Sequence, residues 1–237
     1  MTQPEFDIHA RDYTAMHARS IRASGEEPGY FHDYKISELR SLADLWGLSA
    51  PAILDFGSGI GNSVPYFRRY FPDSRVDLAD VSPESLKMSA DLHGGPEVRV
   101  LIGADGHVPL PDGGHDIVFA ACVFHHLDPA AHDATLRELR RVVRPGGRLM
   151  IFEHNPLNPL TVRAVRDCPF DENAILIRAG EMRGRVTQAG WRGAMIDYHV
   201  FFPAALARLR ALEPGLRWCP LGAQYACHAQ APAAARA

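Results

Sequence analysis

The 237-residue chain is 46% hydrophobic and 22% charged, which is enough to bury a core without help from disulfides. Lysine and arginine number 25 against 28 aspartates and glutamates, so the formal net charge is −3. This balance argues against a protein that coats nucleic acid or acidic membranes, because both need a basic surface. The N-terminal residues are too polar for a signal peptide, and no apolar run reaches the ~18 residues of a membrane helix. The four cysteines lack zinc-binding spacing, and we expect a cytoplasmic protein.

Short apolar runs alternate with helical patterns from residue 52 onward. The expected strands are 52–56, 75–80, 98–102, 116–122 and 149–152, and the expected helices between them are 65–70, one opening at 82–83, and 128–143. A strand at 194–202, a helix at 204–212 and a strand at 221–228 follow nearer the end. This alternation predicts a doubly wound α/β fold, in which helices cover both faces of a mostly parallel sheet.

The patterns favour one main domain with additions at both ends. Residues 35–46 carry apolar side chains on one helical stripe and belong to an N-terminal helical lid. The stretch 155–185 mixes prolines with charges of both signs, so we expect an irregular, variable segment there. The expected division is a lid at 1–46, a main domain at 47–229 that includes the variable segment, and a flexible tail at 230–237.

The most informative segment is AILDFGSGIGN, at residues 52–62. It indicates a strand, then Gly57, Gly59 and Gly61, then a helix, so the backbone can turn sharply and a ligand can lie against the main chain. In an open α/β sheet, ligands bind at the carboxyl end of such a strand. The spacing is GxGxG rather than the GxGxxG of dinucleotide-binding proteins. Asp80 ends the next strand, 19 residues after Gly61, where a carboxylate can accept both hydroxyls of a ribose.

Four ordered blocks resemble the class I S-adenosylmethionine-dependent methyltransferases of the small-molecule type. ILDFGSGIG resembles their first motif, VDLADVSPESL the second, GADGHVPLPDGGHDIVFAACVFHHL the adenine loop with the fourth strand, and LRELRRVVRPGGRLMIFEH the block around the fifth strand. FDIHARDY, at residues 6–13, resembles the family's N-terminal lid. The resemblance implies a seven-stranded Rossmann-like sheet whose last strand is antiparallel. It also implies S-adenosyl-L-methionine as cofactor and S-adenosyl-L-homocysteine as product.

The resemblance implies further that the glycine loop lies along the methionine part of the cofactor. Asp80 would hold the ribose, and Val81 would pack on the adenine. Asp105 would meet the adenine amino edge, although ADG is also ordinary turn chemistry. Asp55 would order the glycine loop, and Lys35 would pair with the cofactor carboxylate or remain solvated. The full set expected to bind the cofactor is Asp55, Gly57, Ser58, Gly59, Gly61, Asp80, Val81, Asp105, Gly106, Cys122, Tyr13 and Lys35.

Candidate catalytic residues lie where the fourth and fifth strands end. His125 and His126 follow the fourth strand, and His154 follows the fifth. Histidine titrates near neutrality, which suits a general base, although each could equally pack or contact the cofactor. No HxxxH or HExxH spacing occurs among them, so no metal is expected. The residues expected to contact the acceptor are Tyr30, Tyr34, Glu153 and Arg163, with Asp171 and Glu172 as further candidates for the pocket wall; the tyrosines could instead pack a helix.

Two other functions fit the same layout. An NAD(P)-dependent oxidoreductase would share the fold, but the glycine spacing and the PGG block speak against it. A protein that binds S-adenosylmethionine without catalysis would keep the glycine loop and both acids. The expected partner is a small-molecule methyl acceptor with an oxygen, nitrogen or carbon nucleophile, and neither nucleic acid nor a membrane span. The protein is expected to be a monomer or a homodimer. Fold alone does not fix the acceptor.

Overall fold

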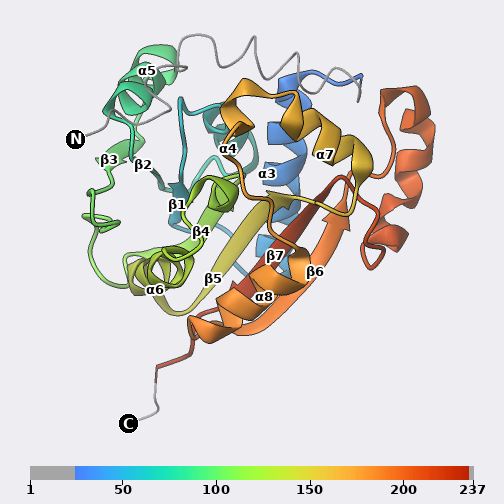
Figure 1. The fold of residues 1–237 in the computed structure, drawn as a ribbon. Helices are drawn as coiled ribbons and strands as arrows, with labels where there is room; N and C mark the ends of the chain where they lie inside the picture. Colours follow the sequence, from blue (N-terminus) through green and yellow to red (C-terminus); the bar gives the residue numbers. More distant parts are fainter. Residues whose placement is uncertain (1–24, 235–237) are drawn as a thin grey trace.

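Seven strands form one mixed sheet in the described part of the chain, residues 25–234 of a computed structural model (Figure 1). The strands are β1 Ile53–Phe56, β2 Val76–Asp80, β3 Val98–Leu101, β4 His115–Ala121, β5 Val143–His154, β6 Arg192–His199 and β7 Gln224–Gln230. Their order is β3-β2-β1-β4-β5-β7-β6. The central β1 pairs in parallel with β2 and β4, whereas β7 runs antiparallel to both β5 and β6. The predicted fold class is therefore confirmed.

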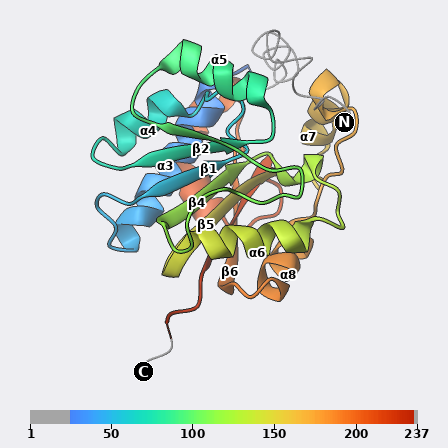
Figure 2. The ribbon, with the colours of Figure 1, turned by 90° about the vertical axis from the view of Figure 1, so that its left-hand side faces the viewer.

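Helices cover both faces of this sheet. The α-helices are α3 Pro28–Leu45, α4 Val64–Tyr70, α5 Pro83–His93, α6 His132–Val142, α7 Pro159–Arg166 and α8 Ala179–Gln188, and the 3-10 helices are η2 Phe124–His126, η3 Pro169–Asp171 and η4 Ala204–Leu216. On one face, α3 and α4 bury Leu39 and Phe67 against Phe119 of β4. On the other face, α6 and α8 bury Leu139 and Met182 (Figure 2). Among the described residues, no helix has the length and apolar character to cross a membrane.

The predicted lid differs from the structure where it can be compared. Its helix begins at Pro28, earlier than residue 35, and Ile36, Leu39 and Ala43 are completely buried. This helix is therefore part of the core rather than a cover over it. Residues 1–24, including Tyr13 and the FDIHARDY segment, lie outside the described residues.

The expectation that residues 155–185 are irregular is wrong. They contain α7, η3 and the first seven residues of α8. Helix α7 begins because the Asn158 side chain accepts hydrogen bonds from the N–H groups of Leu160 and Thr161, and Pro159 follows it. Helix α8 is fixed by tertiary packing, since Met182 and Val186 are fully buried.

Several other elements also differ from the predictions, including β5, which begins at Val143 rather than at 149, and β7, which spans Gln224–Gln230 rather than 221–228. Helix α6 begins at His132 rather than at 128, because η2 and a turn at 128–131 precede it. Strand β6 ends at His199, before Val200, which has a φ of +60°. The predicted helix at 204–212 is the 3-10 helix η4, and no residue of it is buried.

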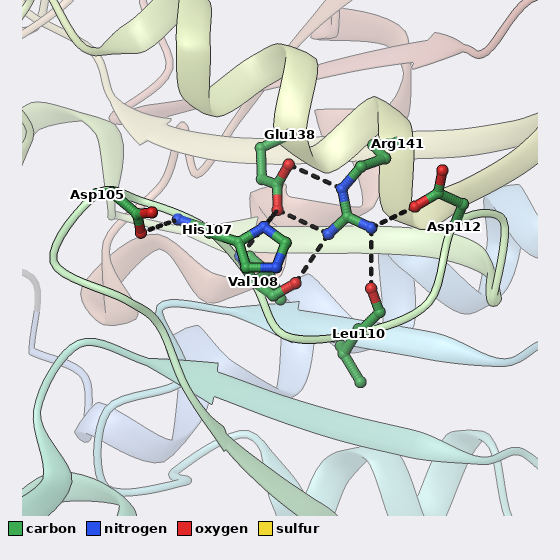
Figure 3. A network of polar contacts seen from close by, with 7 residues as sticks. All are labelled: Asp105, His107, Val108, Leu110, Asp112, Glu138 and Arg141. Carbon is green, nitrogen blue, oxygen red and sulfur yellow. Dashed lines mark hydrogen bonds and ion pairs between the residues drawn. The ribbon is translucent and has the colours of Figure 1, made fainter.

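Arg141 and Glu138 of α6 fix the loop between β3 and β4 (Figure 3). The Arg141 guanidinium donates to the carbonyl oxygens of Val108 and Leu110 at 2.8 and 2.9 Å, and it pairs with Asp112. Glu138 Oε1 accepts the Val108 N–H at 2.8 Å. The loop is thereby held against α6, with Val108 fully buried below it.

Candidate active site

A cavity of about 370 Å³ opens at the carboxyl ends of the central strands. Its floor comes from the residues that follow β1, β2, β4 and β5, which is where a doubly wound sheet binds ligands. Helix α3 supplies Phe31, His32 and Lys35 to its wall, and α7 supplies Leu160 and Thr161. Of these five residues, only Lys35 was a candidate from the sequence. Whether a helical side chain faces the cavity depends on how its helix packs against the sheet.

The glycine loop forms the floor of the cavity beside β1. The N–H groups of Gly57 and Ser58 donate to the Ala79 carbonyl oxygen at 2.8 and 3.1 Å. Gly57 has a φ of +72°, and a Cβ there would lie 2.4 Å from Val123 Cγ2, so only glycine fits. Gly59 has a φ of +53°, and a Cβ there would have nothing within 4 Å. A ligand can therefore approach the backbone closely at Gly59.

Asp80 connects the glycine loop to the end of β2. Its Oδ2 accepts the Gly59 N–H at 2.7 Å, and its Oδ1 accepts the Ser82 N–H at 2.9 Å. The carboxylate lines the cavity. An ionised carboxylate has about four acceptor positions, so these two bonds leave capacity for ligand hydroxyls. Val81 lies beside it on the wall and is 45% exposed.

Asp55 presents a buried carboxylate oxygen without a partner to this cavity. Its Oδ2 makes no hydrogen bond, and neither does the buried Oγ of Ser58. Burial, with Asp80 nearby, raises the pKa of Asp55 to about 7, although Lys35 opposes the shift. The loop bonds come from Ala79 and Asp80 rather than from Asp55, contrary to the role expected for it. Unpaired buried polar atoms indicate a site for a polar ligand.

Lys35 and His154 flank Cys122 at the end of β4. Lys35 Nζ lies 3.3 Å from Cys122 Sγ, and Lys35 is only 5% exposed. Burial alone would raise the pKa of the Cys122 thiol, but Lys35 and His154 lower it to about 6. Cys122 has a φ of +60°, which is uncommon for any residue except glycine. All three side chains line the cavity.

His125 is held between two carboxylates. Its Nδ1 lies 2.5 Å from Glu153 Oε2, and its Nε2 lies 3.4 Å from Asp171 Oδ1. Burial opposes a charge on His125, but Glu153 and Asp171 raise its pKa to about 10. The same Asp171 oxygen is 3.4 Å from His126 Nε2. Burial and the neighbouring His125 lower the pKa of His126 to about 4.

Glu153 does not reach the cavity, which corrects the expectation that it contacts the acceptor. The side chain is fully buried. Its Oε1 accepts the backbone N–H groups of Val123 and Phe124 at 3.1 and 2.8 Å, and its Oε2 faces His125. Both oxygens therefore have protein partners.

Tyr30, Tyr34 and Arg163 also lie off the cavity wall. The face of α3 toward the cavity carries Phe31, His32 and Lys35, so the tyrosines face elsewhere. Tyr34 donates to the Gln224 side chain and packs on Phe152, and Tyr30 packs under Arg210. The Arg163 side chain is 80% exposed and pairs with Asp167. The expected acceptor contacts of these three residues are absent from the described cavity.

Three residues expected to bind the cofactor lie outside the cavity lining. A Cβ on Gly61 would meet Ser89 of α5 at 2.4 Å, so this glycine serves helix packing. Asp105 and Gly106 form a turn, in which Asp105 Oδ1 accepts the His107 N–H at 3.0 Å (Figure 3). This arrangement fits the second role considered for Asp105, in which its side chain stabilises a turn rather than contacting the adenine.

Comparisons with known proteins agree with this geometry. Residues 54–151, from β1 to β5, match a family described as "Methyltransferase domain". By this match, which spans less than half of the chain, the protein resembles the class I S-adenosylmethionine-dependent methyltransferases. The chain is 33% identical over 132 residues to the ubiquinone/menaquinone biosynthesis C-methyltransferase UbiE of Hahella chejuensis, covering 53% of the chain and 52% of the relative. It is 36% identical over 121 residues to the demethylmenaquinone methyltransferase of Thermus thermophilus, covering 49% and 54%.

The curated relatives and the solved structures cover different shares of the chain. The chain spans about half the length of the curated relatives it matches. A structure of the complex between the Haloferax volcanii Trm112 methyltransferase activator and a methyltransferase matches 98% of the chain and 100% of the matched chain, at 20% identity and a TM-score of 0.66. The structure of an S-adenosylmethionine-dependent methyltransferase from Thermotoga maritima matches 85% of the chain and 92% of its own chain, at 15% identity and a TM-score of 0.59. At these identities the structures support the fold alone.

Proposed function

We propose that this methyltransferase moves a methyl group from S-adenosylmethionine to an oxygen, nitrogen or carbon nucleophile of a small-molecule acceptor. The observation that carries the proposal is the polar set around the glycine loop. The unpartnered Asp55 Oδ2, the buried Lys35 and the carboxylate of Asp80 face one cavity. Together they offer an anion for an ammonium, a cation for a carboxylate and acceptors for ribose hydroxyls.

We expect the cofactor to bind these residues in the following orientation. Asp80 would accept the ribose hydroxyls, with Val81 beside the adenine. Asp55 and Lys35 would pair with the ammonium and the carboxylate of the methionine part. When bound, the cofactor supplies the electrophilic methyl group through its sulfonium. The chain's part is to hold that group and the acceptor in line, excluding water.

The acceptor would occupy the half of the cavity toward α7. Its wall combines apolar residues, such as Leu160 and Phe201, with His126, His154 and Thr161. This mixture suits an organic acceptor with an apolar body and one polar end. The curated relatives are named for quinone biosynthesis and, in part, as C-methyltransferases. That naming keeps a carbon nucleophile among the acceptors we propose, beside oxygen and nitrogen.

Two histidines are the general-base candidates that we retain in this proposal. His125 faces carboxylates on both sides, so it is poorly placed to take a proton from an acceptor. His126 and His154 remain on the wall. Removing a true base lowers the rate by about 10²–10⁴-fold while leaving cofactor affinity nearly unchanged. His126→Ala and His154→Ala are therefore compared for turnover and for binding of S-adenosylhomocysteine.

The proposal is tested by calorimetry and by methyl labelling. S-adenosylhomocysteine should bind with micromolar affinity, about −8 kcal/mol, whereas NAD⁺ should not bind. Incubation with methyl-labelled S-adenosylmethionine and a cell extract should place label in the small-molecule fraction. Binding of NAD⁺ alone would support the oxidoreductase, and binding without any labelled product would support the non-catalytic alternative. Label in nucleic acid or protein would contradict the proposed acceptor class.

The compartment and the assembly of the protein remain parts of this proposal. All four cysteines are free thiols, which supports the reducing cytoplasm as its location. A monomer or a homodimer is proposed, and light scattering of the full chain distinguishes them.

A further inference from the structure

Three metal-ligating side chains from two separate parts of the sequence converge on one wall of the cavity. His125 and His126 belong to η2 after β4, and Asp171 belongs to η3, about 45 residues further on. One ligand atom from each of the three lies within 4.8 Å of the other two. Among the described residues, these three form the group of histidine, cysteine or carboxylate side chains whose ligand atoms lie close enough together to share one metal ion.

We propose that His125, His126 and Asp171 bind a divalent transition-metal ion on the wall of the cavity. The distances suit such an ion. Asp171 Oδ1 is 3.4 Å from the Nε2 atoms of both histidines. Two ligands at about 2.1 Å from one tetrahedral ion are themselves separated by about 3.4 Å. An ion could therefore bind with small side-chain movements.

The nitrogen of His125 that faces this position makes only a long contact with the protein, 3.4 Å from Asp171 Oδ1. His125 is 1% exposed, and its Nε2 makes no hydrogen bond. A buried ring nitrogen without a hydrogen bond is costly unless a ligand satisfies it. Two neighbouring carboxylates, from Glu153 and Asp171, favour a cation at this point.

Glu153 provides the support that metal-bound histidines usually have. It faces His125 Nδ1 at 2.5 Å, which leaves Nε2 for the ion. Glu153 is itself fixed by the N–H groups of Val123 and Phe124. A histidine that donates its second ring nitrogen to a fixed carboxylate is the common outer-shell arrangement of protein metal sites.

The ligand types and the location define the class of ion and its use. Two imidazoles with one carboxylate suit Zn²⁺, Fe²⁺ or Co²⁺ better than Mg²⁺ or Ca²⁺, which prefer oxygen ligands. Three protein ligands leave a coordination position open, and His126 and Asp171 line the cavity. The open position would hold an oxygen atom of the methyl acceptor. That use depends on the proposed function, whereas metal binding does not.

The site is tested by titrating Co²⁺ into the full chain, prepared without a histidine tag and freed of metal with a chelator. We expect one ion per chain, visible absorption bands of low-coordinate cobalt, and displacement by Zn²⁺ but not by Mg²⁺. Acetohydroxamate, an oxygen-donor probe, should change the cobalt spectrum through the open position. Absence of saturable cobalt binding would overturn the proposal and leave His125 as an imidazolium between two carboxylates.

Variants locate the ion. His126→Ala and Asp171→Asn should weaken Co²⁺ binding at least about tenfold. Their matched controls are His107→Ala and Asp167→Asn, which change exposed residues outside the cluster and should bind as wild type. Equal binding by all four variants would place the ion elsewhere and overturn the proposal.

A second measurement covers the case in which a variant fails to fold. In the wild-type chain, substoichiometric Mn²⁺ should broaden the ring NMR signals of His125 and His126 and leave those of His107 and His228 sharp. The opposite pattern would overturn the site. Measuring S-adenosylhomocysteine binding by the metal-free chain separates the two proposals. If the chain binds S-adenosylhomocysteine but no metal, only the metal site is contradicted. If the chain binds metal but not S-adenosylhomocysteine, only the proposed function is contradicted.

Discussion

Lys35 of α3 and Cys122 at the end of β4 meet inside the cavity, with Nζ 3.3 Å from Sγ although 87 residues separate them. The contact joins the N-terminal helix to the central strands at the place proposed for the cofactor. A buried ammonium beside a thiol favours the thiolate, so the pair determines both the reactivity of Cys122 and the charge of the cavity.

Cys122 should therefore be alkylated more readily than Cys227 near neutral pH. Its pKa of about 6 makes it mostly thiolate at pH 7, whereas burial raises the pKa of Cys227 to about 12. We expect iodoacetamide to label Cys122 at least about tenfold faster than Cys227 at pH 7, with a rate that rises through pH 6. Lys35→Met should shift this rise to higher pH. Peptide mass spectrometry measures both, and preferential labelling of Cys227 would contradict the prediction.

Substituting alanine for each of two glycines of the same loop should change stability by different amounts. Gly57→Ala adds a Cβ 2.4 Å from Val123 Cγ2 at a φ of +72°, so the free energy of unfolding should fall by about 2 kcal/mol or more. Gly59→Ala meets nothing within 4 Å, so only backbone strain of about 1 kcal/mol is expected. Its Cβ would instead project toward the bound cofactor and weaken the binding of S-adenosylhomocysteine.

Gly47→Ala is the control for this pair. Gly47 has a φ of +71° with nothing within 4 Å and does not line the cavity, so it should cost about 1 kcal/mol without changing cofactor affinity. Denaturant unfolding and calorimetry measure the two effects. Equal stability of Gly57→Ala and Gly59→Ala would show that Val123 can move aside.

Local signals in the sequence were sufficient for the sheet and for the glycine loop. Gly57, Gly59 and Asp80 are close in the chain or end neighbouring strands, so their spacing already predicts their proximity. Asp171 illustrates what could not be predicted. It reaches His126 only because η3 folds back over the end of β4, and no spacing within the chain encodes that contact. The tyrosines of α3 show the same limit, since helix periodicity does not say which face meets the cavity.

Asp80→Ala should lower the affinity for S-adenosylhomocysteine at least about tenfold. The change removes the expected ribose acceptor and also the carboxylate that holds the N–H groups of Gly59 and Ser82. Asp105→Ala is the matched comparison, because Asp105 bonds its own turn and does not line the cavity. We expect less than about a twofold effect from it. A tenfold loss in Asp105→Ala would show that the turn rearranges to reach the adenine.

Arg141→Met should destabilise the loop between β3 and β4. Arg141 holds the carbonyl oxygens of Val108 and Leu110 together with Glu138, so its loss should cost about 1–3 kcal/mol. Arg137→Met, on the exposed side of the same helix, should cost less than about 1 kcal/mol. Arg141 lowers the pKa of Glu138 from 4.5 to about 2, so this stabilisation is full above pH 4.5 and is lost as the pH falls toward 2. Urea unfolding at several pH values tests both statements.

Asp55 predicts how cofactor affinity depends on pH. Burial and Asp80 raise its pKa to about 7, and Lys35 opposes them, so the carboxylate is largely protonated at pH 6 in the free protein. An ammonium can pair only with the ionised form. S-adenosylhomocysteine affinity should therefore rise with pH, by about tenfold per unit below pH 6, and level off above pH 7. Below pH 7, binding should release a proton, which calorimetry detects as a dependence of the heat on the ionisation enthalpy of the buffer.

Asp55→Asn tests the assignment through stability as well as binding. A folded-state pKa raised from 3.8 to about 7 means that the native protein loses stability as the pH rises between those values. The asparagine variant should thus be more stable than wild type at pH 8, by the order of 3 kcal/mol, and should match it more closely at pH 4. It should also bind S-adenosylhomocysteine more weakly at pH 7.5, without proton release. Lys35→Met should move the wild-type transition to higher pH. If Asp55→Asn keeps the wild-type pH dependence of binding, another group titrates, and Asp55 does not receive the ammonium.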